Sequence, residues 1–275
     1  MSNGDDTIDV QGTRVPALGF GTWLVDAADA ADAVRDALEI GYRQIDTARA
    51  YENEREVGRG IADSGVPRDE IFLTTKVPHT DAAPDLVERD GEESLARLGV
   101  DYLDLLLLHW PNPEVPLEQT LGALNRLRDD GRVRQIGVSN FPAGQLRQAL
   151  EIAPLFANQV EYHPFLSQER VLDVARDHDA LVTAYSPLAH GRALNDETLG
   201  RVGAAHGKTA GQVALRWLLD QPLVSPIPKA SSHDRRAENF DVFDFELTPE
   251  ERAEIDALPK DVRTANPPWA PDWDA

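Results

Sequence analysis

Short β-prone runs alternate with longer segments of helical periodicity along the whole chain, and this alternation restricts the fold more than any other feature. Strands that alternate with helices form parallel sheets through right-handed crossovers. We expect strands at residues 16–22, 42–47, 71–77, 102–109, 133–140, 157–162, 181–186 and 224–229. Eight such units in 275 residues predict a closed (β/α)₈ TIM barrel, with residues 1–275 in a single domain.

Two segments lie outside this alternation. Residues 8–15 alternate in hydropathy around Gly12, which predicts a β-hairpin that closes the bottom of the barrel. Residues 259–275 are too rich in proline for a regular element, and Trp269 and Trp273 make them too aromatic for a free tail. We therefore expect this C-terminal tail to pack on the barrel surface or over its mouth.

The composition excludes several classes of function. The chain has no cysteine, which removes disulfides, thiolate metal sites and cysteine nucleophiles and fits a reducing compartment. Residues 1–15 are polar and acidic, and no apolar run is long enough to cross a bilayer, so we expect a cytoplasmic protein. The formal net charge of −21 repels nucleic acid and anionic membranes, so we expect neither as a partner.

Three glycine-containing segments resemble known motifs but lack a required residue. Residues 203–209 have three residues between the glycines where a phosphate-binding loop has four, and we interpret them as a helix stop followed by a cap at Thr209. Residues 19–24 lack the third glycine of a dinucleotide fingerprint, and residues 137–141 lack the second glycine of a nucleophile elbow. The seven histidines include no pair at helical ligand spacing, so we expect no metal site.

Polar side chains stand at the carboxyl ends of three consecutive expected strands, where barrel enzymes carry their functional residues. These side chains are Asp46, Tyr51, Lys76 and His109. A lysine ammonium beside a tyrosine stabilises the phenolate and lowers the tyrosine pKa, which makes the phenol a better proton donor. Asp46 can keep Lys76 charged, and His109 can donate a hydrogen bond to a carbonyl oxygen. Each residue taken alone also fits a structural role, such as a helix cap or a buried histidine.

Residues 41–54, with the sequence Gly-Tyr-Arg-Gln-Ile-Asp-Thr-Ala-Arg-Ala-Tyr-Glu-Asn-Glu, closely resemble the signature of the aldo-keto reductases. The resemblance continues almost to the C-terminus, most like the compact prokaryotic members of the 2,5-diketo-D-gluconate reductase type. Further landmarks match in order at residues 21–23, 75–76, 103–111, 137–141, 158–164, 184–188 and 227–229. The family resemblance implies a barrel reductase in which Asp46, Tyr51, Lys76 and His109 form the catalytic tetrad.

The resemblance also implies that the chain binds NADP(H). It implies that Tyr185 stacks on the nicotinamide ring and that Ser139, Asn140 and Gln159 hold the carboxamide. The remaining cofactor contacts that it implies are Gly21, Thr22, Ser186, Leu188, Lys229, Ser232, Arg235, Glu238 and Asn239, of which Lys229, Ser232 and Arg235 surround the 2′-phosphate. The location agrees with physical expectation, because a lysine, two arginines and a helix start near residue 233 follow the last strand, where such barrels often bind phosphate.

Two positions depart from the family pattern. Ala230 stands where the family usually has a serine that touches the phosphate, which leaves the preference for NADPH over NADH open. Pro78 replaces a tryptophan that often follows the lysine by two residues, which reshapes one wall of the substrate pocket. We expect Trp23 and Trp110 to line that pocket, although both also fit as core aromatics at the barrel mouth.

These observations predict an NADPH-dependent reductase of small-molecule aldehydes or ketones that works without a metal. We expect a monomer or a weak dimer. An alternative is a nicotinamide-nucleotide-binding regulatory subunit with the same fold and little turnover, but the chain lacks a basic or apolar docking arm. A barrel hydrolase or lyase without nicotinamide would need paired carboxylates or a metal cluster, and the sequence indicates neither.

Only four of the 27 basic residues are lysines, and this composition, together with the charge of −21, predicts adaptation to high salt. At about 1 M salt the screening length falls to roughly 3 Å, so repulsion among surface carboxylates weakens. We expect the unfolding midpoint to rise with salt concentration when it is measured from dilute buffer to molar salt. A midpoint that does not rise would refute the adaptation.

Overall fold

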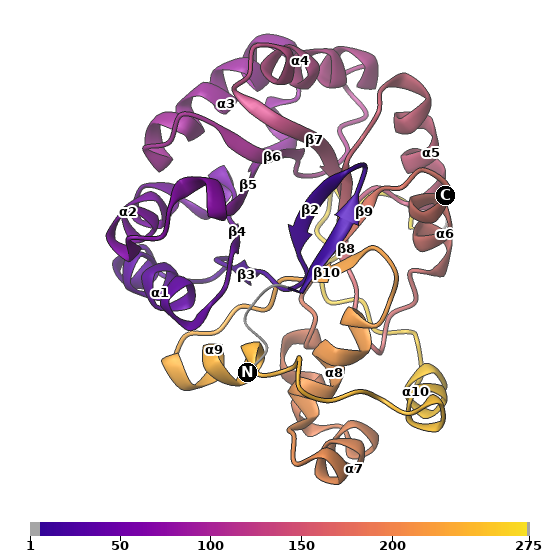
Figure 1. Ribbon diagram of the computed structural model, residues 1–275. Helices are drawn as coiled ribbons and strands as arrows, with labels where there is room; N and C mark the ends of the chain where they lie inside the picture. Colours follow the sequence, from indigo (N-terminus) through magenta and orange to yellow (C-terminus); the bar gives the residue numbers. More distant parts are fainter. Residues whose placement is uncertain (1–5, 274–275) are drawn as a thin grey trace.

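The computed structural model describes residues 6–273, and within them eight parallel strands form one sheet in chain order (Figure 1). The first and last strands are joined by hydrogen bonds from the Gly19 amide to the Pro226 carbonyl (2.9 Å) and from the Gly21 amide to the Pro228 carbonyl (3.2 Å). The predicted (β/α)₈ barrel is confirmed. The strands are β3 (Phe20–Gly21), β4 (Gln44–Asp46), β5 (Phe72–Val77), β6 (Leu103–Leu108), β7 (Val133–Ser139), β8 (Ala157–Glu161), β9 (Leu181–Tyr185) and β10 (Val224–Pro226).

Helices surround the ring of strands (Figure 1). They are α1 (Ala27–Ile40), α2 (Glu54–Ser64), α3 (Pro84–Leu98), α4 (Leu117–Asp129), α5 (Ala143–Ile152), α6 (Glu169–Asp177), α7 (Glu197–His206), α8 (Ala210–Leu219), α9 (His233–Phe240) and α10 (Pro249–Asp256). Short 3₁₀ helices are η1 (Arg49–Tyr51), η2 (Arg68–Glu70), η3 (His79–Asp81) and η4 (Ala189–Asn195). Within the described residues, no helix is both long enough and apolar enough to span a membrane.

Local capping follows the sequence closely. The Thr209 side chain accepts from the Gln212 amide and begins α8, after α7 has ended at the left-handed Gly207. Segment 203–209 is thus a helix stop and a cap, as predicted.

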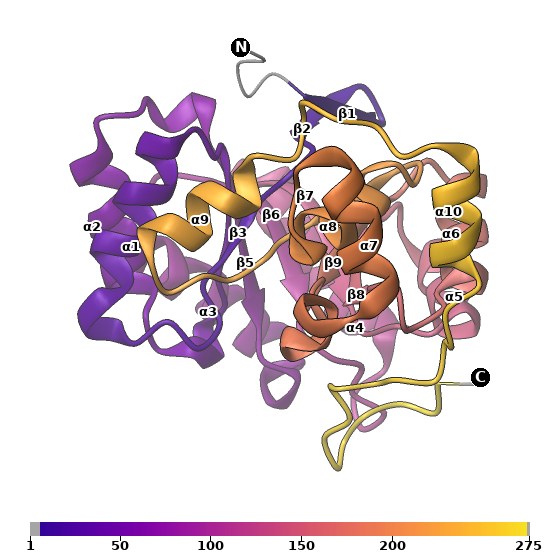
Figure 2. The ribbon, with the colours of Figure 1, turned by 90° about the horizontal axis from the view of Figure 1, so that it is seen from below.

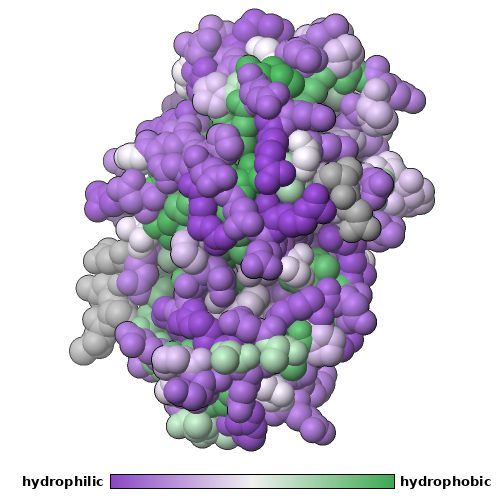
Figure 3. Space-filling view, turned by 90° about the vertical axis from the view of Figure 1, so that its right-hand side faces the viewer, coloured by the Kyte–Doolittle hydropathy of each residue, from purple (hydrophilic) through white to green (hydrophobic). Residues whose placement is uncertain are grey.

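Hydrophilic side chains dominate the face in Figure 3, where apolar ones show mainly in the gaps between them.

The strands divide their side chains between two apolar clusters. In β6, Leu106 faces the larger cluster between the sheet and the helices, whereas Leu105 and Leu107 point into the barrel. Val10 and Val15, both fully buried, join the interior cluster. Because these valines come from the N-terminal hairpin, the hairpin plugs the bottom of the barrel with apolar surface.

This hairpin consists of β1 (Thr7–Val10) and β2 (Thr13–Pro16), paired antiparallel as expected. Its turn residues, Gln11 and Gly12, both have positive φ, which is typical of a type I′ turn. The predicted strand at residues 16–22 is wrong at its start, because Pro16 belongs to the hairpin and only residues 20–21 join the barrel. The predicted strand at 224–229 ends early, at Pro226, and Pro226 and Pro228 lack the amide hydrogen that a longer ladder would need.

Residues 259–273, here called the C-terminal segment, lie at the end of the barrel opposite the hairpin (Figure 2). The Trp269 ring stacks on His79, with centroids 5.1 Å apart, and the Trp273 ring meets Trp110 edge to face at 6.0 Å. His79 and Trp110 follow β5 and β6, so the segment packs over the mouth of the barrel, as expected.

Candidate active site

The four polar residues singled out from the sequence lie together at one end of the barrel. Asp46 ends β4, Tyr51 ends η1, Lys76 lies near the end of β5, and His109 directly follows β6. The His109 amide donates to the Val77 carbonyl (2.9 Å), which continues the parallel pairing to the strand ends. Adjacent parallel strands therefore present these side chains to a common space.

Lys76 is the centre of this group. Its side chain is fully buried, and its ammonium donates to Asp46 Oδ1 (2.6 Å), the Thr47 carbonyl (2.8 Å) and the Tyr51 hydroxyl (3.3 Å). Three acceptors satisfy the three donor positions of an ammonium, which a buried charge requires. The second carboxylate oxygen of Asp46 accepts from Gln159 Nε2 (2.7 Å), so the ion pair joins β4, β5 and β8.

Tyr51 lies between the ammonium and the imidazole. Lys76 Nζ is 5.0 Å from the centre of its ring, and the His109 ring meets it at 5.7 Å with an angle of 74° between the planes. Burial raises the pKa of Tyr51 well above its ordinary value, and the Asp46 carboxylate acts in the same direction. The expectation of a lowered pKa is wrong for this structure, because burial disfavours the phenolate and the Asp46 carboxylate repels it. Tyr51 is therefore fully protonated at neutral pH.

His109 is neutral. Burial lowers its pKa well below the ordinary value of 6.5, and the nearby Lys76 and His79 lower it further. A neutral imidazole carries one N–H, which can donate a single hydrogen bond to an oxygen at the mouth. Burial also lowers the pKa of Lys76, while Asp46 and Glu54 raise it, so these carboxylates oppose the loss of its proton.

The residues expected to hold a carboxamide form a hydrogen-bonded chain beside this group. The Ser139 hydroxyl donates to the Gln159 carbonyl (2.9 Å), and Asn140 Nδ2 donates to the Ser139 hydroxyl (3.1 Å). Asn140 Oδ1 accepts from the Tyr185 hydroxyl (2.7 Å), which fixes the tyrosine ring at the end of β9. Asn140 also donates to the His109 carbonyl (2.9 Å), so this chain and the Lys76 group are one connected network.

The residues expected at the edges of the cofactor site also lie at strand ends. Gly21 approaches the last strand so closely that an added Cβ would lie 2.8 Å from the Ile227 carbonyl oxygen. The Thr22 hydroxyl donates to the Asp46 carbonyl (3.0 Å). Ser186, just after β9, has a left-handed backbone, and Leu188 precedes η4. All four positions border the mouth.

The polar and basic residues that follow the last strand divide into an outward-facing group, which includes those expected around a 2′-phosphate, and one inward-facing arginine. Lys229 is half-buried and its ammonium donates to the Ser231 hydroxyl (2.7 Å), Ser232 caps α9, and Arg235 is exposed. Arg236, which the sequence placed beside them, turns inward and pairs with Asp36 at 2.6 Å. Consecutive helix residues point about 100° apart, which places one arginine outside and the other in the core.

The two residues expected near an adenine have different surroundings. The Glu238 carboxylate accepts from the Thr209 hydroxyl (2.8 Å), which ties α9 to the start of α8. Asn239 is buried. Both lie on α9, close to Ser232 and Arg235 in sequence.

The expected pocket aromatics stand at the rim. The Trp23 side chain is 44% exposed and its ring lies 5.6 Å from His190, whereas Trp110 packs on Trp273. Pro78, which replaces the usual tryptophan, directly precedes η3. The next residue, His79, supplies the ring on which Trp269 stacks. The two tryptophans of the C-terminal segment were not predicted as pocket residues, although their aromatic character had indicated that the segment would pack.

Sequence reasoning missed two buried residues that hold the loop around Tyr51. Asn53 donates to the Thr22 carbonyl (3.1 Å) and Glu54 accepts from the Thr75 hydroxyl (2.6 Å). Arg97 on α3 pairs with Glu54 at 2.6 Å. Asn53 and Glu54 fall within the segment 41–54 that resembles the family signature, and this membership was the only sequence feature that could have indicated their role.

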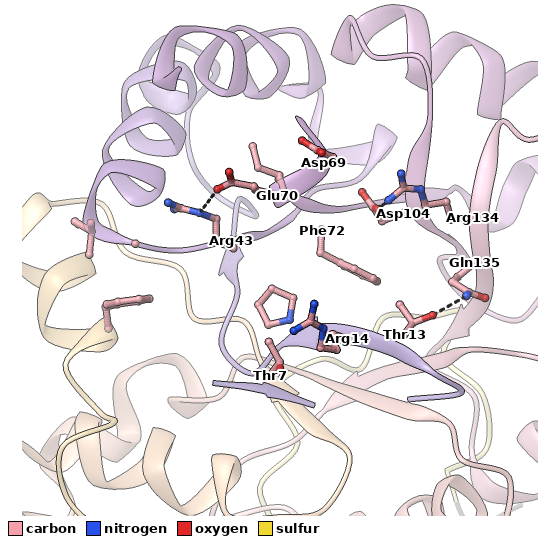
Figure 4. Close-up of a pocket in the computed structure, with 15 residues that line it drawn as sticks. Thr7, Thr13, Arg14, Arg43, Asp69, Glu70, Phe72, Asp104, Arg134 and Gln135 are labelled. Atoms are coloured by element: carbon pink, nitrogen blue, oxygen red, sulfur yellow. Dashed lines mark hydrogen bonds and ion pairs between the residues drawn. The ribbon is translucent and has the colours of Figure 1, made fainter. Parts of the chain in front are cut away.

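A cavity of about 800 Å³ opens at the other end of the barrel (Figure 4). It is lined by hairpin residues such as Thr13 and Arg14 and by the starts of neighbouring strands, with Phe72 pointing toward its centre. None of the predicted site residues lines this cavity.

Within residues 6–273, no group of three or more carboxylate and histidine side chains could hold a metal ion.

The low pKa of His109 predicts a specific pH dependence of stability. Because its folded-state pKa lies below the ordinary value of about 6.5, the unfolded chain takes up a proton that the folded chain does not. The contribution of the neutral His109 to the free energy of unfolding is complete above pH 6.5. It is lost as the pH falls, by at most about 1.4 kcal/mol per pH unit. When the free energy of unfolding is measured with urea at several pH values between 7.5 and 5, it should fall less for His109→Gln than for the unmodified protein. Equal losses would contradict a His109 that is neutral in the folded protein.

Comparison with known proteins agrees with this geometry. The model of the Aldo/keto reductase family matches residues 17–260. A glyoxal reductase of Bacillus subtilis is 42% identical over 268 residues, which cover 96% of each chain. Solved structures match as well. The crystal structure of a candidate 2,5-diketo-D-gluconic acid reductase B has a TM-score of 0.95 at 45% identity and covers 98% of this chain and 97% of that one.

A second matching crystal structure is that of the Bombyx mori aldo-keto reductase in complex with NADP. It has a TM-score of 0.89 at 34% identity, with 95% of both chains covered. These matches span nearly the whole chain, and the solved relatives share its fold. The chain belongs to the aldo/keto reductase family.

Proposed function

We propose that this protein reduces aldehydes and ketones to alcohols, with NADPH as the hydride donor and Tyr51 as the proton donor. The observation that carries the proposal is the buried Lys76 ammonium, bonded to Asp46 at 2.6 Å and to the Tyr51 hydroxyl at 3.3 Å. A protonated phenol beside a fixed positive charge can release its proton when negative charge develops on a substrate oxygen.

Each residue of the group has a distinct part in this proposal. Tyr51 donates its proton to the carbonyl oxygen and becomes a phenolate, which Lys76 stabilises by charge and by hydrogen bonding. Asp46 holds Lys76 in position through the ion pair, and Gln159 in turn holds Asp46 by donating to its other carboxylate oxygen. The neutral His109 donates a hydrogen bond that orients the carbonyl oxygen toward Tyr51. Water then returns the proton to Tyr51.

The residues at the mouth fit a nicotinamide dinucleotide. Tyr185 is held by Asn140 in one orientation, as a stacking surface for a planar ring requires, and Ser139, Asn140 and Gln159 offer amide and hydroxyl groups for a carboxamide. When bound, the reduced nicotinamide supplies a hydride to the carbonyl carbon. The Bombyx mori relative, solved with NADP, supports this choice of cofactor.

The adenosine end of the site fits a phosphate group. Lys229 and Arg235 are accessible cations beside the N-terminus of α9, in a protein whose net charge is −21. Anions are stabilised at a helix N-terminus, and arginine and lysine add charge-assisted hydrogen bonds. We therefore infer that Lys229, Ser232 and Arg235 hold the 2′-phosphate of NADPH.

The substrates we propose are small carbonyl compounds, including dicarbonyls. The glyoxal reductase of Bacillus subtilis, named for its dicarbonyl substrate, supports this class. Trp23 and Trp110 stand at the rim of the mouth, with Trp110 directly after His109 in the chain, where they can exclude water from a bound carbonyl group.

Tyr51→Phe tests the proton donor directly. The variant keeps the ring but loses the acidic hydrogen, so we expect turnover with methylglyoxal and NADPH to fall by about 10³-fold. Its dissociation constant for NADPH, measured by quenching of tryptophan fluorescence, should stay within about twofold. Tyr102→Phe, at the opposite end of the barrel, is the matched control and should keep full turnover.

Two other results would decide against this assignment. Weaker NADPH binding with unchanged turnover per bound cofactor would remove Tyr51 as the proton donor. NADPH binding without turnover of any carbonyl by the unmodified protein would favour the alternative, a nicotinamide-binding regulatory subunit.

Lys229→Ala tests the 2′-phosphate site. A charge-assisted hydrogen bond contributes about 1.5–3 kcal/mol, so NADPH binding should weaken by about tenfold or more. NADH lacks the 2′-phosphate, so its binding should change little. Arg201→Ala, which removes an equal charge from α7, should leave both affinities unchanged. Equal losses for NADPH and NADH in Lys229→Ala would refute the assignment.

A further inference from the structure

A buried carboxylate outside the Lys76 group stands at the end of β8. Glu161 is fully buried, and its Oε1 atom accepts from the Thr264 amide (2.7 Å), the Thr264 hydroxyl (2.5 Å) and His163 Nε2 (3.0 Å). Its Oε2 atom accepts from the Ala265 amide (2.9 Å). The Phe165 amide donates to His163 Nδ1, which leaves the histidine hydrogen on Nε2, facing Glu161.

These contacts keep Glu161 ionised. Burial alone would raise its pKa, but the hydrogen bonds from His163, Thr264 and Ala265 outweigh burial and lower the pKa to about 2. Three of the four bonds come from the C-terminal segment, about a hundred residues further along the chain. The charge of Glu161 is therefore satisfied mainly by that segment.

The attachment continues on both sides of residue 264. Before it, Lys260 Nζ donates to the Pro164 carbonyl (2.6 Å) and the Val262 amide donates to the Phe165 carbonyl (3.0 Å). After it, Trp273 Nε1 donates to Asn266 Oδ1 (3.0 Å). The guanidinium of Arg263, the residue before Thr264, lies 3.7 Å from the centre of the Trp273 ring. These contacts hold Trp273 against Trp110 at the mouth.

We infer that Glu161 is a positioning residue that fixes the C-terminal segment over the barrel mouth, where Trp273 and Trp110 form an aromatic wall of the substrate site. This inference rests on the proposed reductase function. It assigns specificity to the segment: carbonyl compounds with an aromatic group use the wall, whereas methylglyoxal is too small to depend on it. Glu161 acts through the segment and does not touch the reacting atoms.

Glu161→Gln is the test variant. The glutamine amide places an NH₂ group where a carboxylate oxygen accepted a hydrogen bond, so at least one amide of the segment loses its partner. Glu151→Gln makes the same change at an exposed residue of α5 and is the matched control. Thr264→Val removes only the hydroxyl contact and should change the same properties by a smaller amount.

The first readout does not depend on turnover. Trypsin cleaves after arginine, and the bond between Arg263 and Thr264 is held against Glu161 by the Thr264 amide. In Glu161→Gln this bond should be cut at least tenfold faster, with loss of residues 264–275 detected by mass spectrometry. The Glu151→Gln control should match the unmodified protein.

The second readout separates specificity from general damage. In Glu161→Gln the KM for benzaldehyde should rise by about fivefold to tenfold, while kcat and KM for methylglyoxal and the NADPH dissociation constant stay within twofold. In a Trp273→Ala background, which already lacks the wall, Glu161→Gln should not raise the benzaldehyde KM further.

Several outcomes would overturn the inference. Unchanged trypsin cleavage in Glu161→Gln would refute the anchoring, and equal increases of KM for both substrates, or an additional increase in the Trp273→Ala background, would refute the aromatic wall. No turnover of either carbonyl by the unmodified protein would refute the proposed function and the wall together. The trypsin comparison would still decide the anchoring.

Discussion

The ion pair between Lys76 and Asp46 is the interaction on which the rest of the site depends. An ammonium with no exposure to solvent is stable only when its charge and its hydrogen bonds are satisfied, and here Asp46, Thr47 and Tyr51 satisfy them. Removal of either charge would leave the other buried without a partner. The pair therefore fixes the relative positions of β4, β5 and the loop that carries Tyr51.

The surrounding network extends this constraint across the mouth. Gln159 connects Asp46 to β8, and Ser139, Asn140 and Tyr185 continue the hydrogen bonds to β7 and β9. The network leaves Tyr51 protonated and His109 neutral, so the positive charge at the mouth stays on Lys76. A fixed charge that needs no reorganisation is the arrangement that best stabilises a developing oxyanion.

The sequence predicted the fold and the Lys76 group because both depend on local patterns. Alternating strands and helices specify a barrel, and a barrel brings its strand ends together, so Asp46, Lys76 and His109 could be placed without coordinates. The pKa of Tyr51 could not be predicted, because it depends on burial and on the distance between the phenol and the Asp46 carboxylate. The attachment of Thr264 to Glu161 was also missed, since contacts between residues so far apart in the chain leave no local pattern.

The most direct test of the account concerns whether Lys76 acts through Tyr51. Lys76→Met, Tyr51→Phe and the double variant can be compared by the single-turnover rate of NADPH oxidation with methylglyoxal, after tryptophan quenching has confirmed that each binds NADPH. Groups that act as one unit lose their effect together, so we predict that the double variant is no slower than Tyr51→Phe alone. A double variant whose loss equals the product of the two single losses would show that Lys76 and Tyr51 work independently and would contradict the account.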